Sequence, residues 1–110
     1  MKLLAATLIA ATALVATPAL ANKDLATKHG CLACHQPDKK VVGPAYQDIA
    51  KKYAGDKGAE AMLFDRVAKG TAATGGNKWP GPPIPMPPNS PKVPDADIKA
   101  LVKWVLAGAK

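Results

Sequence analysis

The chain has 110 residues, of which 48% are hydrophobic and 21% are charged, and its formal net charge is +7 at pH 7. A chain of this length has room for one domain, which excludes a multidomain protein. The basic balance favours a partner with an acidic docking surface. The lysines are spread along the sequence instead of clustering, which argues against a nucleic-acid-binding protein.

The segment at 1–21 has the features of a secretory signal peptide. One lysine is followed by an uncharged run that is rich in alanine and leucine and ends on Ala19-Leu20-Ala21. This Ala-x-Ala ending is typical of a cleavage site. An uncleaved membrane anchor is the alternative, because the run nearly reaches the length that spans a bilayer. Threonines and a proline dilute the run, so we expect cleavage after Ala21 and a mature protein in the periplasm.

Cleavage would leave one domain at 22–110, with 14 basic and 8 acidic side chains and a formal charge of +6. A chain of this size builds only a modest core, and a bound cofactor commonly supplies the missing stability. We expect no membrane span in the mature protein.

Apolar residues recur at helical spacing and strand-like alternation is missing, so the sequence predicts an all-α fold. The expected helices are a short one from about Asp24 into Cys31, one over 46–53 before Gly55, one over 59–67 that ends at Gly70, and one near the end of the chain. The last helix has the clearest apolar face, which consists of Ile98, Leu101, Val102, Val105 and Leu106. We expect it to begin behind Pro94, with Asp95 as its cap.

The segment from Thr71 to Pro94 differs in kind, because it contains three glycines and eight prolines. Such a composition excludes a helix or a central strand. Long irregular loops within compact domains usually have a function. We therefore expect a functional residue in this loop.

Both cysteines lie in the pentapeptide Cys31-Leu32-Ala33-Cys34-His35. This spacing lets two thiols bond the two vinyl groups of one haem, while the next residue offers an imidazole to the iron. The motif predicts one covalently attached haem c, with Cys31 and Cys34 as anchors and His35 as a ligand of the iron.

Two other types of site use a Cys-x-x-Cys spacing. A dithiol redox site lies beside a βαβ pattern, and no strands are apparent here. A structural zinc site needs four ligands, and His29 is the only further histidine, too close in sequence to complete a tetrahedron comfortably. The export signal and the helical pattern favour haem attachment over both.

The candidates for the second axial ligand are His29, Met62, Met86 and the lysines. His29 is tethered beside the attachment motif, and Met62 lies in a predicted helix, where methionine usually fills the core. Met86 lies in a proline-rich stretch far along the chain. Prolines on both sides restrict its backbone and reduce the entropy lost on ligation, so we favour Met86.

With these motifs in view, the sequence resembles the small bacterial class I cytochromes c of the cytochrome c-551 type. The likeness covers essentially all of 22–110, and four stretches carry it: Gly30-Cys31-Leu32-Ala33-Cys34-His35, Val42-Gly43-Pro44-Ala45-Tyr46, Ile84-Pro85-Met86-Pro87-Pro88-Asn89 and Lys103-Trp104-Val105-Leu106. The resemblance implies about four short helices around one haem, with the first and last helices crossing near Gly30.

The resemblance also implies roles for individual residues around the haem. His35 and Met86 would be the axial ligands, and the carbonyl of Pro44 would accept a hydrogen bond from His35. Asn89 would lie near the Met86 sulfur. Arg66 and Trp79 would approach the haem propionates. The stretch from Trp79 to Met86 is two residues longer here than is usual in the family, so we expect a bulge in this loop that affects the Trp79 contact more than the Met86 ligation.

The function implied is single-electron transport by an iron that has no open position, and no enzymatic activity. The resemblance implies a monomer. We expect redox protein partners such as a cytochrome bc1-type donor and a terminal oxidase or nitrite reductase acceptor. The rival is a haem protein with an open iron that binds gases or reduces peroxide. Related dihaem peroxidases need a second attachment motif, and the chain has one.

Overall fold

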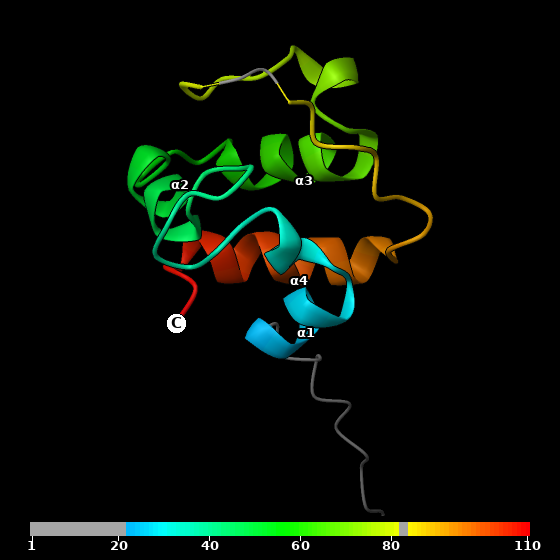
Figure 1. The fold of residues 1–110 in the computed structure, drawn as a ribbon, viewed down its shortest axis with the longest axis horizontal. Helices are drawn as coiled ribbons and strands as arrows, with labels where there is room; N and C mark the ends of the chain where they lie inside the picture. Colours follow the sequence, from blue (N-terminus) through cyan, green and yellow to red (C-terminus); the bar gives the residue numbers. More distant parts are fainter. Residues whose placement is uncertain (1–21, 82–83) are drawn as a thin grey trace, which may run out of the picture.

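The computed structural model describes residues 22–81 and 84–110, and the predicted signal peptide at 1–21 lies outside them (Figure 1). The predicted all-α fold is confirmed. The four α-helices are α1 (Lys23–Lys28), α2 (Tyr46–Lys52), α3 (Ala59–Lys69) and α4 (Asp95–Leu106), and two 3-10 turns are η1 (Cys31–Ala33) and η2 (Ala72–Thr74). In the described ranges, strand-like pairing is limited to one isolated bridge between His35 and Lys40.

Helix α4 is the centre of the packing. It contacts α3, α2 and α1, and Figure 1 shows α3 and α4 lying across the molecule with α1 on the outer side of α4. The predicted apolar face of α4 is confirmed at four of its five positions, since Ile98, Leu101, Val102 and Val105 are buried while Leu106 is partly exposed. The core forms two clusters, one with Trp104 against α1 and α2 and one with Ile98 against α3. In the described part of the chain, no helix is both long enough and apolar enough to cross a bilayer.

The first helix ends earlier than the sequence indicated. Asn22 begins it, because the Asn22 side chain accepts a hydrogen bond from the Leu25 amide at 3.1 Å. The prediction that it continues into Cys31 is wrong. Gly30 has φ +74°, a left-handed conformation that ends the α-helix, and Cys31 then starts η1.

The prediction that Asp95 caps α4 is also wrong. Pro94 occupies the cap position and Asp95 is the first helical residue. Its carboxylate accepts a hydrogen bond from the Ser90 hydroxyl at 3.0 Å and does not bond the helix amides. A negative charge in the first turn still favours the helix through its dipole.

One polar contact joins the two ends of the chain. The His29 ring nitrogen Nε2 lies 2.9 Å from the Asp97 carboxylate, linking the end of α1 to the first turn of α4. Next to it, the Ala26 side chain is completely buried. The sequence indicated His29 only as a candidate metal ligand, and its contact with Asp97 was not predicted.

We expect Asp97→Ala to lower the free energy of unfolding by about 1 kcal/mol, because it leaves the largely buried His29 without its partner. Denaturant unfolding of the holoprotein measures the change. Asp65→Ala is the control, since Asp65 pairs with Lys69 on the exposed surface of α3, where an (i, i+4) pair contributes only about 0.3–0.5 kcal/mol. Equal losses in the two variants would contradict a structural role for the contact between α1 and α4.

Candidate haem-binding site

The two cysteines are presented on one side of a tight turn. Cys31 starts η1 and Cys34 follows its end, and a 3-10 helix has three residues per turn, so both side chains project in the same direction. Both thiols are free; Cys34 is exposed and Cys31 is partly buried. Burial raises the pKa of the Cys31 thiol. The donor set is therefore two unpaired thiols followed directly by an imidazole, which is the chemistry that covalent haem attachment requires.

A loop folds back on the attachment motif and orients His35. The Gly43 amide donates to the Cys34 carbonyl at 2.7 Å. The carbonyl of the following residue, Pro44, lies 2.8 Å from His35 Nδ1. A carbonyl only accepts hydrogen bonds, so Nδ1 carries the hydrogen and Nε2 carries the lone pair in the neutral ring. Burial lowers the pKa of His35, although the Pro44 contact opposes this effect. The neutral, metal-binding form of the imidazole is thus favoured.

Tyr46 borders the His35 ring and Trp104 packs against Tyr46, and neither was predicted as a site residue. Tyr46, at the start of α2, stacks on the His35 ring with ring centroids 5.2 Å apart, and Trp104 of α4 meets the edge of Tyr46 at 5.5 Å. Burial, and then the nearby Cys31 thiol, raise the pKa of Tyr46, so its hydroxyl stays neutral. Gly43 approaches so closely that a Cβ there would lie 2.8 Å from Nδ1 and 2.9 Å from Nε2.

Met86 lies in the loop that returns from α3, and its main chain is fixed. Its amide donates to the Thr71 hydroxyl at 2.9 Å, and the Thr71 amide donates to the Met86 carbonyl at 3.0 Å. Gly70, which ends α3, also touches this segment, because a Cβ there would lie 3.0 Å from the Met86 oxygen. In its described residues, the predicted irregular loop contains one short 3-10 helix, η2, and a turn at 90–92.

Asn89 fixes the chain just after Met86. Its backbone amide and its side-chain amide both donate to the Val67 carbonyl at 3.1 Å, and the side chain also reaches the Pro87 carbonyl. The Ser90 amide donates to the Ala68 carbonyl. These two carbonyls belong to the last turn of α3, where a helix leaves acceptors without internal partners. The segment that carries Met86 is therefore anchored to the end of α3.

The described residues do not provide the four ligands that a structural zinc site needs. Among the described residues, no three His, Cys, Asp or Glu side chains gather where they could hold a metal ion.

A family model described as "Cytochrome c" matches residues 19–109. The chain belongs to the cytochrome c family.

Individual relatives agree with this membership. The chain is 47% identical over 84 residues to a cytochrome c2 of Rubrivivax gelatinosus, covering 76% of this chain and 92% of that protein. It is 50% identical over 78 residues to a cytochrome c-551 of Pseudomonas aeruginosa, covering 71% and 67%. Among solved structures, cytochrome c552 of Nitrosomonas europaea aligns with a TM-score of 0.67 at 47% identity, covering 77% of this chain and 96% of that one.

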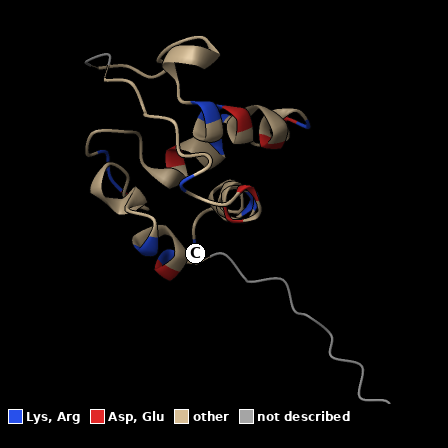
Figure 2. Cartoon of the chain, turned by 90° about the vertical axis from the view of Figure 1, so that its right-hand side faces the viewer, with Lys and Arg blue, Asp and Glu red and all other residues tan. Residues whose placement is uncertain are grey.

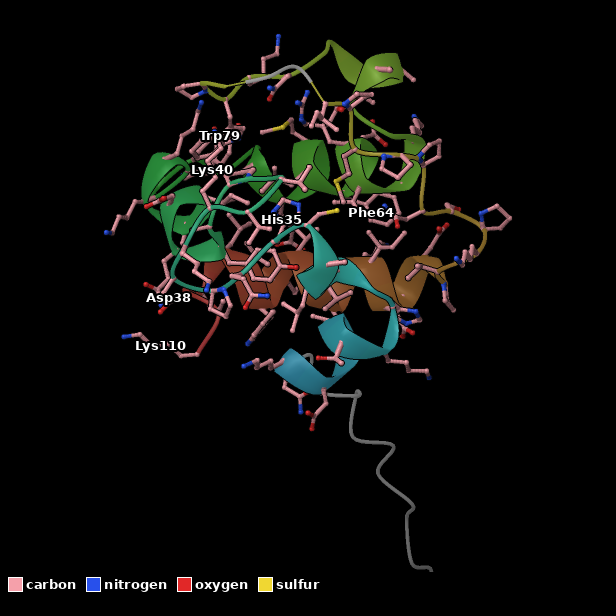
Figure 3. All side chains as sticks on the ribbon, in the orientation of Figure 1. His35, Asp38, Lys40, Phe64, Trp79 and Lys110 are labelled. Atoms are coloured by element: carbon pink, nitrogen blue, oxygen red, sulfur yellow. The ribbon has the colours of Figure 1, made fainter. Side chains whose placement is uncertain are left out.

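Membership in the cytochrome c family makes this chain a small electron-carrier haem protein with one covalently attached haem c, and the predicted small class I type is confirmed. Its relatives are electron-transfer proteins that exchange electrons with other proteins. Cys31, Cys34 and His35 fit the attachment motif. Figure 3 shows His35 in the middle of the molecule, between α3 and α4.

Two further residues expected near the haem make contacts within this cytochrome. Arg66 is buried and donates to the carbonyls of Thr74 at 3.0 Å and Gly76 at 2.7 Å. Trp79 packs partly buried against the core cluster of α1, α2 and α4, with the Lys52 ammonium 4.5 Å from its ring centroid. Both side chains are ordered by neighbouring protein groups.

Proposed function

We propose that this cytochrome is a periplasmic electron carrier whose iron is ligated by His35 and Met86. The observation that carries the proposal is the hydrogen bond from His35 Nδ1 to the Pro44 carbonyl, because it leaves Nε2 as the ligating nitrogen and aligns the ring. The bound haem supplies a one-electron couple between ferrous and ferric iron.

Met86 is supported as the second ligand by the way its backbone is held. Hydrogen bonds to Thr71 on one side and to the end of α3 through Asn89 on the other restrict where the thioether can go. A thioether ligand and a buried site both favour ferrous iron, so the reduction potential is high for a haem. If His35 and Met86 both hold the iron, substrates would have no place on it, and electron transfer would be the activity that remains.

We assign the propionate contacts to Arg66 and Trp79. Arg66 uses two of its five N–H groups on the loop carbonyls, which leaves donors for a carboxylate. Trp79 is held at the side of the molecule where Lys40 and Lys52 bond the carbonyls of Pro80 and Lys78 (Figure 3). Asn89 uses its amide hydrogens on carbonyls, so it positions the segment that carries Met86.

Redox partners would dock where exposed apolar side chains accompany lysines. Val41, Val42 and Ile84 are 47%, 43% and 58% exposed, unusually high for large apolar residues, and Lys39 and Lys40 precede the two valines. Figure 2 shows basic and acidic residues mixed over the helices. The excess of lysine would therefore raise the rate of encounter with an acidic partner more than it would fix the partner in one orientation. Weak and fast complexes suit a monomeric carrier between a cytochrome bc1-type donor and a terminal oxidase or nitrite reductase.

Localisation to the periplasm follows from the proposed cleavage after Ala21. The next residue, Asn22, provides the side chain that begins α1, so a mature chain starting there keeps the cap of its first helix. Haem attachment uses both cysteines, and neither is left for a disulfide in that oxidising compartment.

Visible spectra of the protein from the periplasmic fraction, oxidised and reduced, with and without carbon monoxide, test the proposal. We expect low-spin ferrous bands, a weak far-red sulfur-to-iron band in the oxidised form, and no response to carbon monoxide. High-spin bands that shift with carbon monoxide would contradict the electron-carrier proposal and favour a haem protein with an open iron.

A further inference from the structure

Thr71 makes contacts that none of the roles assigned above explains. It lies between α3 and η2, is half-buried, and makes two hydrogen bonds to one residue fifteen positions away, Met86. Building on the proposed ligation, we infer that Thr71 is the positioning residue that keeps the Met86 thioether on the iron and so excludes external ligands.

The composition of the Met86 segment makes the Thr71 hydroxyl important. From Pro85 to Pro88 the chain has three prolines, which lack an N–H, so Met86 offers the only backbone donor in that stretch. Its acceptor is the Thr71 hydroxyl, at 2.9 Å. No neighbouring amide in the stretch can replace this bond if the hydroxyl is removed.

Thr71 is itself held rigidly. Its carbonyl accepts hydrogen bonds from the amides of Thr74 at 3.2 Å and Gly76 at 2.7 Å, which closes a compact loop. The Thr74 hydroxyl in turn donates to the Gly70 carbonyl at 2.8 Å. The buried Arg66 side chain of α3 donates to the carbonyls of Thr74 and Gly76. The position of Thr71 is therefore tied to α3 and not only to its own loop.

Close packing supports the same arrangement. Gly70 precedes Thr71 with φ +84°, and a Cβ at Gly70 would lie 3.0 Å from both the Met86 oxygen and the Pro88 nitrogen. The backbone at Gly70 thus touches the backbone of the segment at 86–88. Beside this contact, the Thr71 side chain accepts the hydrogen bond from the Met86 amide. A displaced Met86 would have to break both Thr71 hydrogen bonds and lose this contact.

The test compares imidazole binding to the oxidised holoprotein of wild type, Thr71→Val, Thr71→Ser and Met86→Ala, monitored by the visible spectrum. Valine keeps the shape of threonine and removes the acceptor, so the affinity for imidazole should rise on the order of tenfold and the far-red band should weaken. Serine keeps the hydroxyl and should restore wild-type behaviour. Thr27→Val is the matched control, since the Thr27 hydroxyl donates to the Lys23 carbonyl within α1 and takes no part in the contact between Thr71 and Met86.

The variants separate failure of this inference from failure of the proposed ligation. If Met86→Ala binds imidazole strongly while Thr71→Val stays within twofold of wild type, Met86 is the ligand and Thr71 does not position it. If Met86→Ala behaves as wild type, the proposed ligation itself is wrong, and the inference falls with it.

A second measurement serves if Thr71→Val does not yield holoprotein. Hydrogen exchange of the Met86 amide in the wild type should be slowed at least as much as that of the Asn89 amide, which bonds the Val67 carbonyl. Exchange of the Met86 amide as fast as in an unstructured loop would overturn the inference.

Discussion

Replacement of Met86 by alanine should leave the haem attached and open the iron to external ligands. Attachment depends on Cys31 and Cys34, which the substitution does not touch. Loss of the thioether removes a ligand that favours ferrous iron, so the reduction potential should fall by on the order of 0.1–0.2 V, within the roughly 0.8 V over which axial ligands set haem potentials. Redox titration and carbon monoxide binding to the reduced protein measure both effects.

Met62→Ala is the control for the loss of a methionine. Met62 lies half-buried in α3, and its replacement should leave the spectrum and the potential unchanged. A Met86→Ala protein that kept its potential and its far-red band would show that another residue ligates the iron.

The second large effect is expected at Gly43, where alanine would push against the His35 ring. The added Cβ would lie under 3.0 Å from three ring atoms, Nδ1, Nε2 and Cε1, and Tyr46 stacks on the same ring and limits its movement. Moving the ring would also break its hydrogen bond to Pro44. We expect the free energy of unfolding to fall by about 3 kcal/mol, the upper end of overpacking effects, with a matching loss of holoprotein.

Gly58→Ala separates this close contact from the general effect of replacing glycine. Gly58 has φ −88°, a conformation open to alanine, and the nearest atom to an added Cβ is an Asp56 oxygen at 3.5 Å. Since Gly58 precedes α3 at its cap position, a change of at most about 1 kcal/mol is expected. The yield of holoprotein by haem absorbance and denaturant unfolding compare the two variants, and equal stabilities would contradict the close approach at Gly43.

The helices and the attachment residues could be predicted because their signals are local. The apolar period over 46–53, 59–67 and the last helix gives elements whose observed bounds differ by a residue or two, and Gly70 ends α3 as expected. The Cys-x-x-Cys-His spacing directly indicates covalent haem attachment. These features depend on residues a few positions apart, where sequence and geometry are directly related.

Contacts between distant segments could not be read from the sequence. The bond between His29 and Asp97 spans 68 positions, and the bond between Thr71 and Met86 joins two irregular segments that have no period. The cap of α4 was missed for a local reason: Pro94 takes the position for which an aspartate is the stronger signal. The two missed contacts, in contrast, depend on how distant segments pack together.

Much of the polar framework at this site accepts its hydrogen bonds on main-chain oxygens: those of Pro44, Val67, Thr74, Gly76 and Pro87. Every amino acid has the same carbonyl, so a new side chain at these positions keeps the acceptor as long as the backbone path is kept. Sequence divergence can therefore proceed at the acceptor positions while the donors, His35, Arg66 and Asn89, keep their partners. A saturation mutagenesis screen of this protein would show more tolerance at Val67 and Pro87 than at the three donors, whereas Gly76, with φ +76°, should accept few replacements.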